Sequence, residues 1–258
     1  MILAIDIGNT NIVVGAMEGD TPLFVERLST DSGKTDLECA VSLRTVLDIH
    51  SLSPEGFEGC IIASVVPPVT GTVSQALEKL LGQIPMIVGP GLKTGLNIKI
   101  ENPAQLGSDL VVDAVAGIAE YPLPLLIIDM GTATTISAVD RRGTYLGGVI
   151  IPGARVSLDS LSSHASQLPR IGFEPPKKPI GTNTVECMKS GIVLGNEYLL
   201  DGMLTSLEVD LGAPPTVIDA RGLSHYIIPY CRRKIIYDDT LLLKGLNTIY
   251  HKNIDRRG

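Results

Sequence analysis

Tryptophan is absent from this chain of 258 residues, and aromatic residues make up only 4% of it. Hydrophobic residues nevertheless account for 44%, so the core has to be built mainly from aliphatic side chains. Isoleucine, valine, leucine and alanine are typical of buried parallel strands that are covered by helices. The composition therefore favours an α/β fold and excludes a wholly disordered chain.

An excess of basic charge is also missing, because the formal net charge is −7 and the pI is about 5.1. Proteins that bind nucleic acid usually carry a basic surface, so nucleic acid is not an expected partner. No apolar run reaches about 18 residues, which predicts no membrane span. The stretch Met1–Asp6 lacks the basic start of a signal peptide, and the four cysteines form no C-x-x-C pair. We expect a cytoplasmic protein with reduced thiols and no zinc site.

The chain contains one long-range repeat. Residues 2–28 and 125–151 both begin with an apolar run that ends in an aspartate, Asp6 or Asp129, and a glycine follows two positions later. A polar cluster, a β-rich stretch, a turn with glycine and a second apolar stretch then follow in each copy. Each copy therefore predicts three strands joined by two tight turns.

Further elements are predicted between and after the two copies. Pro122 and Pro124 interrupt the helical pattern that precedes the second copy, which predicts an N-terminal half of residues 1–118 and a C-terminal half of residues 119–258. A serine-rich loop is expected before His164. Hydrophobic periodicity predicts helices at residues 35–50, 69–81, 108–120, 184–207 and 239–251, and strands near residues 59–64, 85–88, 216–219 and 234–236.

The two aspartate-glycine turns are candidate phosphate sites. Gly8 and Gly131 would adopt backbone angles closed to other residues and let a ligand approach closely. The Asn and Thr residues that follow offer neutral donors suited to phosphate oxygens. A carboxylate beside phosphate requires a cation, which gives Asp6 and Asp129 a role. One such turn alone would indicate an ordinary Asx turn, but two copies in matched contexts favour a site that grips successive phosphates.

Several motifs together resemble one family. They are Asp6–Asn11, Ser64–Pro67, Gly89–Leu96, Asn102–Pro103, Gly107–Asp109, Asp129–Thr135, Gly147–Gly153 and Gly181–Thr184. Over nearly its whole length the chain resembles the type III pantothenate kinases, which belong to the actin/hexokinase/Hsp70 ATPase superfamily. The resemblance implies two duplicated actin-like (ribonuclease H-like) halves, each a mixed sheet with flanking helices, and a nucleotide cleft between them.

The resemblance also implies a reaction, in which ATP phosphorylates pantothenate to 4′-phosphopantothenate in the first step of coenzyme A biosynthesis. It implies Mg²⁺, a monovalent cation such as potassium or ammonium, and a homodimer. Asp109 would be the catalytic base, although without the family context it could equally cap its helix. Asp6 and Asp129 would be metal ligands. The nucleotide would contact Asp6, Gly8, Asn9, Thr10, Asn11, Val13, Gly131 and Thr132, and pantothenate would contact Gly107, Ser108, Thr184 and the residue at Leu110.

Two positions depart from the family pattern. Leu110 stands where the G-x-D-R element has arginine, and Ala220-Arg221-Gly222 replaces a late glycine-rich turn. The charge missing at Leu110 could come from one of three basic residues, Lys93, Arg155 or Arg170. These departures leave two other hypotheses open. One is a regulatory protein that binds nucleotide or pantothenate without catalysis, and the other is a kinase or phosphohydrolase with a different acceptor.

Overall fold

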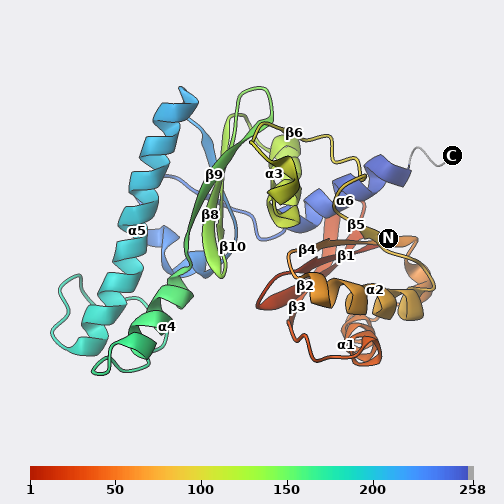
Figure 1. Cartoon of the computed structure of the whole chain (residues 1–258), viewed down its shortest axis with the longest axis horizontal. Coiled ribbons are helices and arrows are strands. Elements are labelled where there is room, and N and C mark those ends of the chain that lie inside the picture. Colours follow the sequence, from red (N-terminus) through yellow and green to blue (C-terminus); the bar gives the residue numbers. More distant parts are fainter. Residues whose placement is uncertain (255–258) are drawn as a thin grey trace. The chain divides into compact units, whose positions relative to one another are not determined.

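The structure, a computed structural model, describes residues 1–254 of the chain. The chain divides into two compact units, each with its own β-sheet. Unit 1 comprises Met1–Leu96, Glu101–Glu120 and the chain from Thr240 on, and unit 2 comprises Asn97–Ile100 and Tyr121–Asp239. The colours of Figure 1 follow the chain through both units.

Unit 1 contains a five-stranded sheet with the strand order β3-β2-β1-β4-β5. The first three strands form an antiparallel meander, and β4 and β5 extend the sheet by parallel pairing beyond β1. Its strands are β1 (Ile2–Ile7), β2 (Asn11–Glu18), β3 (Thr21–Ser29), β4 (Gly59–Ser64) and β5 (Met86–Ile87), and its helices are α1 (Asp36–Ile49), α2 (Pro67–Leu81), α3 (Ser108–Glu120) and α6 (Leu241–Ile254).

Unit 2 contains a six-stranded sheet with the strand order β11-β10-β7-β8-β9-β6. Its strands are β6 (Asn97–Ile98), β7 (Leu125–Met130), β8 (Ala133–Val139), β9 (Thr144–Pro152), β10 (Thr216–Gly222) and β11 (Ile236–Tyr237), and its helices are α4 (Ala154–His164) and α5 (Thr184–Leu211).

The two sheets repeat one topology. The order β9-β8-β7-β10-β11 in unit 2 matches β3-β2-β1-β4-β5 in unit 1, and β6 is an additional edge strand. In both units a meander of three antiparallel strands is followed by two strands in parallel pairing. The structure therefore confirms the α/β fold class and the duplication predicted from the sequence.

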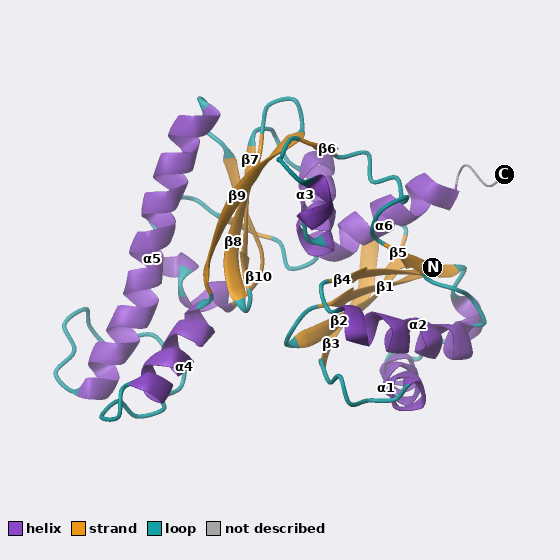
Figure 2. Ribbon diagram, in the orientation of Figure 1, coloured by secondary structure: helices purple, strands orange, loops and turns teal. Residues whose placement is uncertain are grey.

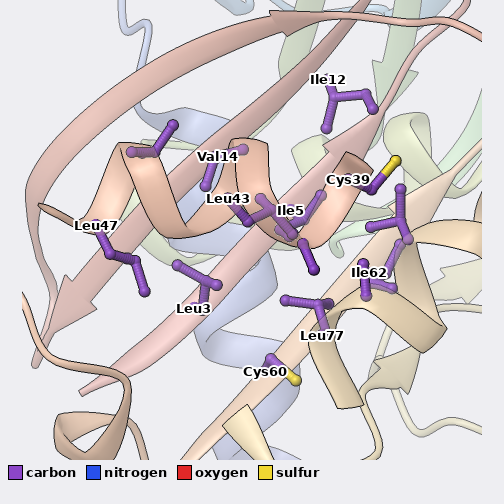
Figure 3. Close-up of a cluster of buried hydrophobic side chains, with 14 of the residues drawn as sticks. Leu3, Ile5, Ile12, Val14, Cys39, Leu43, Leu47, Cys60, Ile62 and Leu77 are labelled. Carbon is purple, nitrogen blue, oxygen red and sulfur yellow. The ribbon is translucent and has the colours of Figure 1, made fainter. Parts of the chain in front are cut away.

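The strand β1 separates two apolar layers in unit 1. Leu3 and Ile5 pack against α1 and α2, and Figure 3 shows this cluster with the helix side chains around it. Ile2 and Ala4 pack on the other face against α3 and α6, and Figure 2 shows these helix pairs on opposite sides of the sheet. Because side chains alternate along a strand, the buried Asp6 lies on the α3/α6 face.

The strand β7 is organised in the same way in unit 2. Leu126, Ile128 and Met130 pack with the buried faces of α4 and α5, and Figure 1 shows these two helices covering one side of the sheet. Alternation then places Asp129 on the opposite face of the sheet from α4 and α5. In each unit, the alternation of side chains along the first strand therefore decides on which face of the sheet the turn aspartate lies.

The helix predicted at residues 35–50 is present as α1 with its capping box formed. The Glu38 amide donates to the Thr35 hydroxyl oxygen at 3.3 Å, and the Thr35 amide donates to the Glu38 carboxylate at 2.8 Å. Two backbone donors at the helix start are thereby satisfied. The predicted bounds of β4 and α3 match the structure, whereas α5 and β10 extend to Leu211 and Gly222.

Two elements differ from the prediction. The serine-rich stretch before His164 forms the helix α4 rather than a loop. The predicted boundary near residue 119 lies close to the change of unit at residue 121, but α6 belongs to unit 1 and not to a C-terminal half. Leu242, Leu246 and Ile249 of α6 are buried with β1 and α3, which is the physical reason for this placement.

Two further expectations concern the cysteine thiols, expected to be reduced, and membrane spans, expected to be absent. All four cysteines are free, and Cys187 is exposed whereas Cys39 and Cys60 are buried. Among residues 1–254, no helix combines the length and the hydrophobicity that a membrane crossing requires.

Candidate active site

The first aspartate-glycine turn joins β1 to β2. The Gly8 amide donates to the Asn11 carbonyl oxygen at 3.0 Å, which closes the turn. Thr30 braces it, because its hydroxyl donates to the Gly8 carbonyl at 2.7 Å and its amide donates to the Thr10 carbonyl at 3.0 Å. The side chains of Asn9, Thr10 and Asn11 are exposed. The predicted phosphate residues are thus brought together on one braced turn with neutral donors toward solvent.

Asp6 lies just below this turn. It pairs with Val13 in the β1–β2 register, and Val13 is half-buried. The Asp6 residue is only 2% exposed, at the end of a strand and beside the exposed polar donors of the turn. A carboxylate oxygen in this position suits a hard divalent cation shared with phosphate oxygens.

The second turn joins β7 to β8 and repeats the arrangement. The Gly131 amide donates to the Ala133 carbonyl at 3.0 Å, and the Gly153 amide donates to the Thr132 carbonyl at 3.0 Å. Gly131 and Thr132 are exposed, whereas Asp129 is 8% exposed. Both predicted phosphate turns therefore have the same form: a buried aspartate, then an exposed turn held by backbone bonds.

The expected backbone angles of the turn glycines are wrong. Neither Gly8 nor Gly131 has a positive φ. A Cβ at position 8 would lie 3.2 Å from the Asn11 carbonyl oxygen, which is tighter than ordinary contact, and a Cβ at position 131 would meet only ordinary contacts. Gly8 therefore allows a tight turn, whereas a Cβ at position 131 would fit without displacing its neighbours.

The start of α3 is fixed to the same sheet edge as the first turn. The Ser108 hydroxyl donates to the Ser64 carbonyl and accepts from the Ser64 amide, both at 2.9 Å. Ser64 ends β4 and pairs with Ile7 at the end of β1. Asp109, in the first turn of α3, is therefore held at the edge of unit 1 that also carries the first phosphate turn.

Gly107 leaves the space that the Asp109 carboxylate occupies. A Cβ at position 107 would lie 2.5 Å from Asp109 Oδ1. We expect Gly107→Ala to displace this carboxylate. Where Asp109 is the base that the family resemblance implies, kcat should fall by about tenfold or more, because small misplacements of a catalytic group are costly. The melting temperature should change little, since the obstructed atom ends a side chain that can rotate. Steady-state kinetics and thermal melts check this, and an unchanged kcat would contradict it.

Of the three basic residues that could supply the charge missing at position 110, one, Lys93, belongs to the same unit as Leu110. Leu110 is half-buried in the first turn of α3. Arg155 and Arg170 belong to unit 2, whereas Lys93 belongs to unit 1, and all three are exposed. The backbone of Lys93 is held by Asn253, whose amide group donates to the Lys93 carbonyl at 3.0 Å and accepts from the Lys93 amide at 3.1 Å.

Thr184 is distant in sequence from the other predicted pantothenate residues and belongs to a different unit. It is exposed at the start of α5, directly after Asn183, whose side-chain oxygen accepts from the Glu186 amide at 3.0 Å. Gly107 and Ser108 belong to unit 1, but Thr184 belongs to unit 2. The structure brings Gly107 and Ser108 together with Asp109, and the role of Thr184 stays a prediction.

An arginine contacts the second turn aspartate, and the sequence did not predict this contact. Arg221 Nε donates to Asp129 Oδ2 at 2.9 Å, and Arg221 Nη2 lies 2.9 Å from the same oxygen. The departure at Arg221 was visible in the sequence, but its partner lies 92 positions away. The only signal in the sequence was Arg221 itself, a basic residue in place of the family's glycine-rich turn, together with the expectation that Asp129 binds a cation.

Asp219 is a second buried acid at this end of unit 2. It is fully buried on β10, and the pKa of its carboxyl is raised to about 7. Burial is the main cause; the Ser224 hydroxyl lowers the pKa and the charge of Asp129 raises it by smaller amounts. Asp219 pairs with Ile128 in the β10–β7 register, so alternation places its side chain on the opposite face of the sheet from Asp129. Within the described part of the chain, no cluster of three or more His, Cys, Asp or Glu side chains is arranged to hold a metal ion.

Two units with one topology, each with an aspartate-glycine turn after its first strand, give the chain an actin/hexokinase-like fold. Component A of (R)-2-hydroxyglutaryl-CoA dehydratase from Acidaminococcus fermentans matches with a TM-score of 0.58 at 13% identity over 96% of each chain. A ROK hexokinase from Thermus thermophilus matches with a TM-score of 0.52 at 14% identity over 97% of this chain and 99% of that one. At such identities the likeness shows the fold alone.

The chain belongs to the type III pantothenate kinase family, whose model matches residues 2–206. The type III pantothenate kinase of Halalkalibacterium halodurans is 41% identical over 254 residues, which cover 98% of this chain and 100% of that relative. The type III pantothenate kinase of an Exiguobacterium species is 42% identical over 253 residues, which cover 98% and 99% of the two chains. These comparisons confirm the resemblance that the motifs indicate.

Proposed function

We propose that the chain transfers the γ-phosphoryl group of ATP to the primary hydroxyl of pantothenate and so forms 4′-phosphopantothenate, the first step of coenzyme A biosynthesis. The observation that carries this proposal is the full-length similarity to type III pantothenate kinases, such as 41% identity over 98% of the chain. The placement of Asp109 at the same sheet edge as the first phosphate turn supports it.

Asp109 acts as the general base in this proposal. A primary alcohol is too weak an acid to ionise before it attacks phosphorus, so a carboxylate within hydrogen-bond reach orients the hydroxyl and accepts its proton late. Phosphoryl transfer passes through a loose transition state, and catalysis is mostly positioning and charge stabilisation. The Ser108–Ser64 hydrogen bonds and the space at Gly107 supply that positioning for Asp109.

The two turns hold the nucleotide phosphates. The neutral donors of the first turn and the exposed Gly131 and Thr132 of the second suit phosphate oxygens. Asp6 fits a divalent cation, and Mg²⁺ bound there would neutralise charge on the phosphates. The proposed nucleotide residues are Asp6, Gly8, Asn9, Thr10, Asn11, Val13, Gly131 and Thr132, and the proposed pantothenate residues are Gly107, Ser108, Thr184 and Leu110.

Three finer parts of the hypothesis rest on the family resemblance. They are a homodimer, a cytoplasmic location and a monovalent cation at Asp129. Sedimentation velocity of the purified chain tests the homodimer. The monovalent cation requires a carboxylate that can accept it, and the Arg221 contact at Asp129 bears directly on that requirement. ATP and Mg²⁺ therefore remain part of the proposal.

The deciding experiment measures ADP release by the purified chain with Mg²⁺ and ATP, in the presence and absence of pantothenate. Mass spectrometry of the reaction mixture identifies the product. ADP release that depends on pantothenate and yields 4′-phosphopantothenate is the expected result. ADP release without pantothenate would instead favour a phosphohydrolase, and release only with other alcohols would favour a kinase with a different acceptor.

A regulatory binding protein is the second candidate function. Two observations favour it. Leu110 stands where the family motif has arginine, next to the proposed base, and Arg221 donates a hydrogen bond to a carboxylate oxygen of Asp129. Such a protein would bind ATP or pantothenate without turnover. Isothermal titration with each ligand, combined with no ADP release, would support this candidate over the kinase.

Leu110→Arg is expected to lower the KM for pantothenate by about tenfold to about a hundredfold, as a charge-assisted hydrogen bond to the substrate carboxylate would. Leu110 is only half-buried, so the new guanidinium can reach solvent and need not be buried unpaired. Leu110→Gln is the matched control, because it adds polarity without charge. A higher KM together with a lower melting temperature in Leu110→Arg would mean that the site depends on leucine packing.

A further inference from the structure

Asp129 and Arg221 form an ion pair at the carboxyl end of the central strands of unit 2. Both Nε and Nη2 of the guanidinium lie 2.9 Å from Asp129 Oδ2. The side chains are 11% exposed at Asp129 and 17% exposed at Arg221, so the pair is largely shielded from solvent. Shielding strengthens the attraction and limits exchange with ions from solution.

An irregularity in β10 delivers Arg221 to this position. Asp219 pairs with Ile128 and Gly222 pairs with Met130, so β10 uses three steps where β7 uses two. In a regular ladder Arg221 would stand opposite Met130, on the face that packs against α4 and α5. The extra residue re-aims the strand, as β-bulges commonly do, and the Arg221 side chain contacts Asp129 on the other face.

Gly222 is required for this local path. Its backbone has φ 99° and ψ −145°, a combination that residues with a side chain rarely adopt. A Cβ at this position would lie 2.0 Å from the Met130 carbonyl oxygen. The backbone of Gly222 therefore lies close to β7 at the end of β10. The same register irregularity places the preceding residue, Arg221.

The residues around Asp129 do not fit a monovalent metal ion. Asp129 Oδ2 already accepts from a guanidinium, whose charge would repel a second cation at the same oxygen. Within residues 1–254, no group of three or more His, Cys, Asp or Glu side chains is arranged to hold a metal ion. A carboxylate beside phosphate still needs a positive partner, and the chain supplies one itself.

We propose that Arg221 takes the place of a soluble monovalent cation at Asp129, so that the phosphotransfer runs equally well without potassium or ammonium. This inference rests on the proposed function, because it assigns a role in phosphate binding to the second turn. A guanidinium stays protonated throughout the physiological pH range, so the charge at Asp129 is permanent. Removal of that charge should create a site that potassium can fill.

The test compares pantothenate-dependent ADP release and MgATP affinity in potassium, ammonium, sodium and choline chloride at matched ionic strength. Wild-type turnover and Kd for MgATP should differ by less than about twofold among the salts. Arg221→Ala opens the position, and its activity and MgATP affinity should fall in choline and recover by about tenfold or more in potassium or ammonium, which is the scale of one charge-assisted contact.

Three variants sharpen the result. Arg221→Lys retains a fixed cation and should stay independent of potassium, whereas Arg221→Gln fills the space without charge and should be weak in every salt. Arg233→Ala is the matched control, since Arg233 pairs with Glu208 in the same unit and its loss should leave the wild-type salt response unchanged. If Arg221→Ala does not fold, the responses of the wild type and of the Lys and Gln variants still decide the matter.

The outcomes separate this inference from the proposed function. Turnover by the wild type that rises about tenfold or more in potassium over choline would overturn the inference and leave the kinase assignment intact. Absence of pantothenate-dependent turnover in every salt would overturn the kinase assignment. The MgATP titrations would then still test the inference, which fails if potassium tightens binding to the wild type or has no effect on Arg221→Ala.

Discussion

Asp109→Asn is expected to reduce pantothenate-dependent turnover by about 10²- to 10⁴-fold, the usual contribution of a general base, while MgATP still binds. The substitution preserves size and polarity but removes the proton acceptor. The Ser108–Ser64 hydrogen bonds that fix the start of α3 do not involve this side chain, so the helix should keep its place. Steady-state kinetics and titration with MgATP measure the two effects separately.

Glu120→Gln is the control for this prediction. Glu120 lies at the other end of α3 and pairs with Lys244 at 3.0 Å, so the variant also removes one carboxylate from the same helix. Its turnover should remain close to that of the wild type. If Asp109→Asn retained more than about a tenth of the wild-type kcat, a base contribution of the usual size would be excluded.

The second large effect is expected on stability, from Asp219→Asn. Burial raises the pKa of the Asp219 carboxyl to about 7 in the folded chain, whereas an unfolded aspartate titrates near about 4. Between these values the folded state binds more protons than the unfolded state, so this group makes the wild type less stable as the pH rises. Asparagine has no such proton to lose. The variant should therefore gain stability relative to the wild type from pH 5 to pH 8, by up to about 3 kcal/mol.

Urea unfolding of both proteins at several pH values measures this difference. Asp140→Asn is the control, because hydrogen bonds from the Thr144 and Arg142 amides lower the pKa of the Asp140 carboxyl. The stability that Asp140 contributes is lost only as the pH falls below its unfolded value. Its variant should therefore differ from the wild type by a constant amount between pH 5 and pH 8. A constant offset for Asp219→Asn as well would contradict the raised pKa.

Local patterns in the sequence were sufficient to predict the elements that carry the site. The apolar run before each aspartate identifies β1 and β7, and the Thr35–Glu38 capping box identifies the start of α1. The helix α4 escaped prediction because serine competes for backbone hydrogen bonds and lowers helix propensity, and because Gly153 offers no capping side chain. Packing on the sheet of unit 2 stabilises this helix instead.

Long-range placement could not be predicted. The periodicity of α6 indicates an amphipathic helix but not which sheet it covers, and only the fold shows that it packs in unit 1. The Asp129–Arg221 contact depends on an extra residue in β10, and a register irregularity leaves no periodic signal in the sequence. The proposed base is different, because its motif is local and its helix begins at the predicted residue.

The return of α6 to unit 1 has a consequence for biosynthesis on the ribosome. Leu242, Leu246 and Ile249 complete the apolar layer beneath β1, yet the ribosome makes them more than 200 residues later. Almost all of unit 2 is contiguous in the chain, between Tyr121 and Asp239, so it can mature while the nascent chain is still attached. Unit 1 has to wait, with the α3/α6 side of its sheet covered by α3 alone, until residues 241–254 emerge. During translation the N-terminal sheet is therefore the part of the nascent chain that chaperones have most reason to protect.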